Sequence, residues 1–129
     1  MATGIQLERR RLNEEIENAF ITSAQAAANV EMKIISGKGN VFYDFLDFHT
    51  QFNYLVRLTS GLPEMTPKDM PKPLELLKGY LLEWLHTPVK VSDSASNLEM
   101  HCRRGLRLFD EYYNELMHCG IISLPTRKG

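Results

Sequence analysis

Two Glu-x-x-His sequences are the motifs of this chain that come closest to a metal-binding pattern. They are Glu83-Trp-Leu-His86 and Glu115-Leu-Met-His118. Residues three apart on a helix project from one side, so each motif presents a carboxylate beside an imidazole, as in carboxylate-bridged dimetal bundles. Both histidines, however, fall at the C-terminal ends of predicted helices. In an antiparallel pair these ends lie far apart, and a histidine there also stabilises the last free carbonyls. We therefore do not expect one joint dimetal site.

A second grouping of polar residues depends on how the helices are arranged. If neighbours run antiparallel, the C-terminal ends of segments 5–36 and 73–86 meet the N-terminal ends of segments 41–60 and 95–119. The side chains there that suit a divalent transition metal are Glu83, His86, Glu99 and His101, with Asp47 completing the set. Helix capping and solvated faces explain the same residues one at a time. A metal-binding bundle is therefore an alternative interpretation, and the main interpretation includes no cofactor.

Basic residues gather at the opposite end of the predicted bundle. Arg9, Arg10 and Arg11 lie in the first turns of a long helix, where positive charge opposes the helix dipole. Such a local cost can be kept for binding phosphate or an acidic partner. Glu14 and Glu15 follow Arg10 and Arg11 at a spacing of four, which favours an ordinary salt-bridged face. The net charge of -1 also argues against nucleic acid as the partner. A nucleic-acid-associated regulatory factor is a further alternative.

The sequence contains no recognisable pairing of a nucleophile with a base. There is no Gly-x-Ser-x-Gly, no Cys-x-x-Cys, and no phosphate-binding loop in the segment SGKGN. Cys102 and Cys119 are about 25 Å apart if they share one helix, too far for a disulfide. Unpaired thiols indicate a reducing compartment, and the lack of a long apolar run argues against a membrane span. We expect a cytoplasmic chain without catalytic activity.

Apolar side chains recur every three or four residues in four stretches, which predicts helices. The predicted helices cover about 5–36, 41–60, 73–86 and 95–119. We expect an all-α, antiparallel four-helix bundle that forms a single domain, 1–129. The apolar face of the second helix is aromatic, with Phe42, Phe45, His49, Phe52 and Val56.

Residues at the predicted helix ends fit the preferences of helix caps. Gly37 and Gly39 end the first helix. Asn40 caps the start of the second, and Ser96 with Glu99 is expected to form a capping box in the fourth.

The unequal lengths of the helices point to self-association. At 1.5 Å per residue the first helix spans about 48 Å and the third about 20 Å, so the first and fourth would extend beyond their partners. The segment from Leu62 to Lys72 is rich in proline and carries Met65 and Met70 as candidate binding residues. We therefore expect a non-enzymatic protein-protein interaction module, either a homodimer or a binder of another protein, that self-associates through its first and fourth helices.

Overall fold

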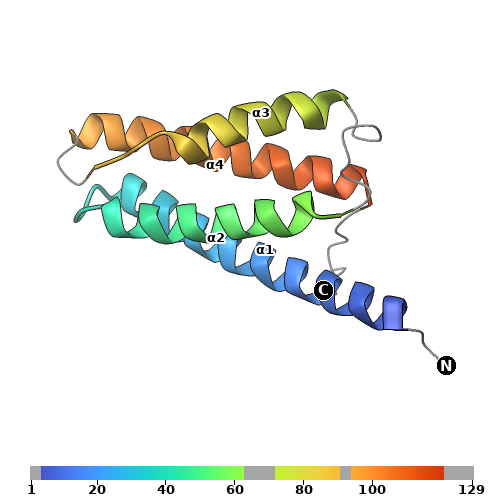
Figure 1. The fold of residues 1–129 in the computed structure, drawn as a ribbon. Coiled ribbons are helices and arrows are strands. Elements are labelled where there is room, and N and C mark those ends of the chain that lie inside the picture. Colours follow the sequence, from blue (N-terminus) through green and yellow to red (C-terminus); the bar gives the residue numbers. More distant parts are fainter. Residues whose placement is uncertain (1–3, 63–71, 91–93, 121–129) are drawn as a thin grey trace.

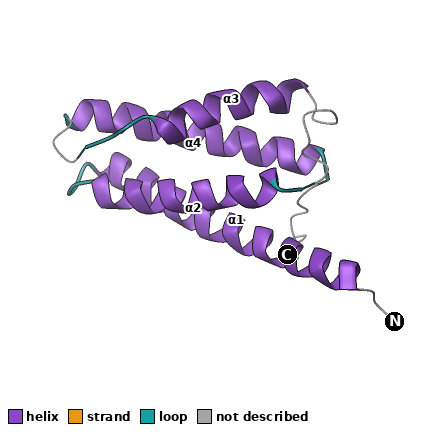
Figure 2. Ribbon diagram, viewed as in Figure 1, coloured by secondary structure: helices purple, strands orange, loops and turns teal. Residues whose placement is uncertain are grey.

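The computed structural model describes residues 4–62, 72–90 and 94–120, with side chains of the first helix described from Arg11 onward. These residues form α1 (Gly4–Ser36), α2 (Phe42–Ser60), α3 (Lys72–His86) and α4 (Ala95–His118), and no strand occurs among them. Figure 2 shows the helices joined only by loops and turns. The predicted all-α class and the four helix positions are confirmed, with ends that shift by one residue.

The first helix boundary follows the sequence prediction closely. Gly37 and Gly39 both have positive φ, 63° and 80°, so the chain leaves α1 in a conformation that suits glycine. The predicted N-cap Asn40 is wrong by one residue, because Val41 occupies the N-cap position of α2. The Asn40 carboxamide oxygen still accepts a hydrogen bond from the Phe42 N–H at 2.8 Å, which satisfies one free donor at the start of α2.

The predicted capping box at the start of α4 is wrong. Ser94, two residues earlier than Ser96, is the N-cap, and its hydroxyl accepts a hydrogen bond from the Asn97 N–H at 3.2 Å. Ser94 has an extended backbone with ψ near 149°, the conformation that an N-cap needs. Both serines fit the preference, so the composition of the segment could not distinguish them.

The four helices pack as two antiparallel hairpins. α1 packs most closely on α2, and α3 packs most closely on α4. In Figure 1 the C-terminal ends of α1 and α3 lie at the same end of the molecule as the N-terminal ends of α2 and α4, as an antiparallel four-helix bundle requires. The N-terminal turns of α1 extend past the other helices, whereas α4 runs alongside α3. The predicted overhang is therefore present for the first helix.

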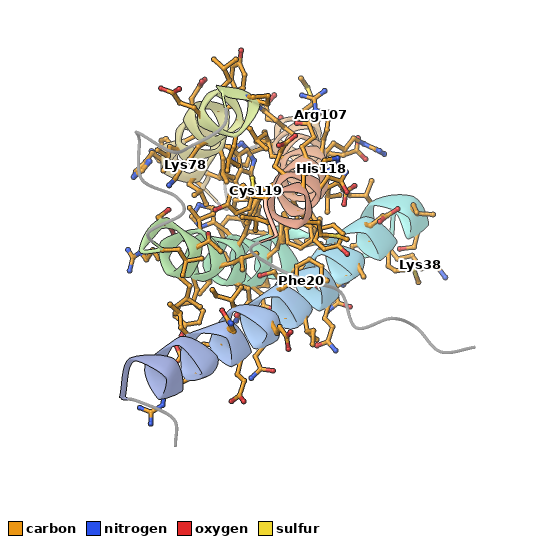
Figure 3. The ribbon with its side chains drawn as sticks, turned by 90° about the vertical axis from the view of Figure 1, so that its right-hand side faces the viewer. Phe20, Lys38, Lys78, Arg107, His118 and Cys119 are labelled. Atoms are coloured by element: carbon orange, nitrogen blue, oxygen red, sulfur yellow. The ribbon has the colours of Figure 1, made fainter. Side chains whose placement is uncertain are left out.

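Large aromatic side chains fill the space between the two hairpins. The rings in contact across it come from α2 (Phe45, Phe48, His49 and Phe52), from α3 (Trp84) and from α4 (His101, Phe109 and Tyr112). Phe20 of α1 adds stacked contacts with Phe109 and Tyr113 of α4. Figure 3 shows Phe20 between α1 and α4. Burial of these rings supplies much of the hydrophobic stabilisation between the hairpins.

Trp84 lies at the centre of this aromatic core and is fully buried. Its indole N–H donates a hydrogen bond of 2.7 Å to the carbonyl oxygen of His101 in α4. Gly105, one turn further along α4, has no side chain to fill the space that the indole occupies. A Cβ at position 105 would lie only 2.2 Å from Cζ2 of Trp84, so the close contact between α3 and α4 requires glycine here.

Candidate functional site

In both Glu-x-x-His motifs the histidine lies at the end of its helix. There one ring nitrogen forms a hydrogen bond with a backbone carbonyl of the preceding turn. Nδ1 of His86 donates to the carbonyl oxygen of Leu82 at 2.7 Å. Nδ1 of His118 makes the same bond with the carbonyl oxygen of Asn114 at 3.0 Å. Each imidazole thus adds a hydrogen bond to a carbonyl one turn earlier in its own helix, close to the helix C-terminus. As expected, α3 and α4 end at opposite ends of the bundle (Figure 1).

The five residues of the predicted metal site have separate surroundings. Glu83 lies 3.7 Å from the guanidinium of Arg104, and Glu99 lies 3.7 Å from that of Arg103. Asp47 is exposed on α2. Within residues 4–62, 72–90 and 94–120, no three His, Cys, Asp or Glu side chains gather closely enough to hold a metal ion.

The antiparallel arrangement does bring the ends of the four helices together, but Glu83 and Glu99 each lie beside an arginine and not beside each other. The metal alternative thus gains nothing from the geometry and stays a prediction. Elemental analysis of purified protein tests it.

His101 differs from the other four because its ring is packed in the aromatic core. It stacks on Trp84 with ring centroids 5.0 Å apart and an interplanar angle of 16°. Its Nε2 is buried and has no hydrogen-bond partner among the described residues. Burial, followed by the nearby charges of His49 and Arg104, lowers the pKa of His101. The neutral ring is therefore the form that fits this stack.

His49 lies on the other side of the same indole. Its ring centroid is 5.4 Å from that of Trp84, and its Nε2 donates to the carbonyl oxygen of Leu85 at 2.9 Å. That carbonyl is in the last turn of α3, where no helical N–H is available to it. His49 thus connects α2 to the end of α3.

The predicted binding residues are only partly described. Arg9, Arg10 and Arg11 belong to the first turns of α1, and the side chain of Arg11 is exposed. Met65 and Met70 lie outside the described residues. Nothing in the described residues favours nucleic acid, and this further alternative also stays a prediction.

The side of α1 that faces away from the bundle carries a second apolar stripe. We call this the α1 outer stripe; its residues are Ile21, Gln25, Ala28, Met32 and Ile35. All five are exposed, and 49% of the surface of Ile21, 67% of Met32 and 72% of Ile35 is open to solvent. The intervals are four, three, four and three residues, which keeps the stripe on one side of the helix.

The α1 outer stripe is also free of charge through most of its length. Residues 18–30 contain no Asp, Glu, Lys, Arg or His. The exposed positions of this run are Asn18, Ile21, Thr22, Gln25, Ala28 and Asn29. Charged residues return on both sides, with Glu17 before the run and Glu31 after it. An uncharged centre between charged edges is typical of the surface that one protein presents to another.

The outer face of α4 provides a contrast within the same molecule. Its exposed side chains include Arg103, Arg107, Asp110 and Glu111, the mixture expected for a face in water. The sequence analysis grouped the first and fourth helices together because of their length. Their exposed residues differ in charge, and of these two helices only α1 has an uncharged outer side.

Two of the shallow grooves on the surface lie next to α3. One, of about 340 Å³, lies between α3 and α4 and is lined by Leu76, Tyr80, Glu111 and Glu115 among others. The other, of about 610 Å³, lies between α2 and α3 and includes Asn53, Arg57 and His86. Neither groove brings together an acid, a base and a nucleophile, the combination that catalysis of group transfer most often uses.

Compared with known proteins, the chain matches no family model, no curated protein and no solved structure. No helix in the described part of the chain has the length and apolar character needed to cross a membrane.

Proposed function

We propose that this chain is a non-enzymatic helical interaction module that self-associates through the α1 outer stripe. The observation that carries the proposal is the pattern of α1, which has apolar residues on two sides. One side, including Ile16 and Val30, is buried against the bundle. The other side is exposed in the single chain and lacks charge over residues 18–30. A helix that is apolar on both sides is stable in water when both sides are covered.

The chemistry of the stripe favours a second copy of the chain as the partner. Ile21, Met32 and Ile35 offer aliphatic and thioether surface, while Ala28 between them allows a second helix to come close. Because the same stripe is present on every copy, two copies can bury it against each other in one symmetric contact.

Light scattering on the purified chain tests the proposal. We expect a dimer at micromolar concentration, and we expect Met32→Glu or Ile35→Glu to weaken it at least about tenfold, since each carboxylate enters a symmetric interface twice without a partner. Met100→Glu is the matched control, because Met100 is 69% exposed on the charged face of α4. A wild-type chain that stays monomeric at high micromolar concentration, or a dimer that Met100→Glu disrupts as strongly as Met32→Glu does, refutes the proposal.

A further inference from the structure

The α1 outer stripe reads almost the same in both directions. Its intervals are four, three, four and three residues, so reversing the helix gives three, four, three and four. Ala28 is at the centre, and Ile21 and Ile35 are each seven residues from it. When two such helices lie antiparallel with Ala28 facing Ala28, each Ile21 meets the partner's Ile35. The smallest side chain is then where the two helix axes are closest.

The charges at the edges of the stripe favour the same orientation. In the antiparallel register, residues whose numbers add up to about 56 face each other, which brings Glu17 of one copy near Lys38 of the other at both ends of the contact. Both side chains are exposed, and Lys38 lies just beyond the end of α1 (Figure 3). In a parallel pair Glu17 would face Glu17, and Glu31 would face Glu31. Like charges at such positions are repulsive, and opposite charges are attractive.

We infer that two copies pair through α1 in an antiparallel arrangement with a two-fold axis at Ala28, an inference that rests on the proposed self-association. The stripe is about 21 Å long and about 10 Å wide, the width of one helix. Two such strips cover roughly 400 Å² of flat area, which is at the small end of protein interfaces. A contact of this size with few charges gives a dimer that exchanges subunits.

Disulfide trapping with the double variant Ile21→Cys/Ile35→Cys tests the orientation. The variant is made with Cys119→Ser, since Cys119 is half-buried, while the remaining Cys102 is fully buried. Within one copy, positions 21 and 35 are about 21 Å apart along the helix and cannot form a disulfide. Oxidation therefore reports only contacts between copies.

Trypsin separates the two positions and identifies the bond. Cleavage after Arg11, Lys33 and Lys38 places residue 21 in peptide 12–33 and residue 35 in peptide 34–38. The antiparallel arrangement is expected to link 12–33 to 34–38. Neither Ile21→Cys nor Ile35→Cys alone should cross-link, because each cysteine would be about 21 Å from the same cysteine in the other chain. Ala28→Cys should cross-link with itself, and Met100→Cys on α4 is the negative control.

The possible results separate the orientation from the proposed function. Links of 12–33 to itself and of 34–38 to itself, with self-linking of each single variant, would show a parallel pair; this overturns the antiparallel inference and leaves self-association through α1 in place. A dimer in light scattering that gives no link at position 21, 28 or 35 overturns both, because the interface then lies elsewhere. A monomer in light scattering overturns the proposed function itself.

Discussion

Replacing Gly105 with alanine adds one methyl group at the tightest contact between α3 and α4. The new Cβ would lie 2.2, 2.6 and 2.9 Å from three atoms of the Trp84 indole, well inside van der Waals distance. The indole has no free space to move into, since it is fully buried and has rings of α2 and α4 around it. The ring therefore has to shift by about 1 Å, or α3 and α4 have to separate.

The size of the effect follows from three contributions. Forcing an extra methyl into a packed core typically costs about 1–3 kcal/mol. Moving the indole also weakens its hydrogen bond to the carbonyl oxygen of His101, a loss of about 1 kcal/mol. Alanine regains about 1 kcal/mol because it favours helix more than glycine does. We expect the free energy of unfolding to fall by about 1–3 kcal/mol, which lowers Tm by roughly 4–12 °C.

Thermal and urea unfolding followed by circular dichroism measure this change, with Gly79→Ala as the matched control. Gly79 is also inside a helix, but an added Cβ there meets nothing within 4 Å. Gly79→Ala should therefore raise the free energy of unfolding by up to about 1 kcal/mol. The double variant Gly105→Ala/Trp84→Phe should lose less stability than the sum of the two single variants, because phenylalanine lacks the indole atoms with which the new Cβ collides. If Gly105→Ala is as stabilising as Gly79→Ala, our account of the contact is wrong.

Three further predictions concern polar groups of the core. The pKa of His101 lies below its ordinary 6.5. The stability of the protein should therefore be constant above pH 6.5 and should fall as the pH drops through the lowered pKa of this histidine. Urea midpoints measured against pH should show this loss in the wild type and a weaker loss in His101→Phe. Urea unfolding should show a loss of about 2 kcal/mol for Thr59→Val and of about 1 kcal/mol for Tyr112→Phe. Thr59→Val leaves the buried Tyr112 hydroxyl without its partner. Tyr112→Phe leaves the Thr59 hydroxyl bonded to helix carbonyls, so it costs less. Burial raises the pKa of Cys102 to about 11, so iodoacetamide at pH 8 should label Cys119 well before Cys102 in the native protein, and both thiols equally in urea. Equal labelling of the native protein would contradict this last expectation.

The helices could be predicted because the apolar period of each one is long and its ends are marked. The sequence shows two glycines where α1 ends. Both adopt positive φ in the structure, a conformation that other residues rarely take. The start of α4 was predicted two residues too late because Ser94 and Ser96 have the same capping chemistry. Only packing in three dimensions distinguishes two such neighbours, and it selected Ser94.

The candidate surface was partly missed for a different reason. The sequence analysis used helix length to select both the first and the fourth helix. In the structure Ala26 and Ala27 pack inside the bundle, but Ala28 is exposed together with Gln25 and Met32. The absence of charged residues from 18 to 30 can be read from the sequence. It would have indicated that the outer side of α1 is also covered, by a partner.

The contact that positions Gly105 also makes Trp84 an intrinsic optical reporter. The chain contains a single tryptophan, and it lies where the α1–α2 hairpin meets the α3–α4 hairpin. Its fluorescence emission therefore shifts to longer wavelength when the hairpins separate, even if every helix remains intact. One unlabelled protein thus allows the docking of the two hairpins to be followed separately from the loss of helix.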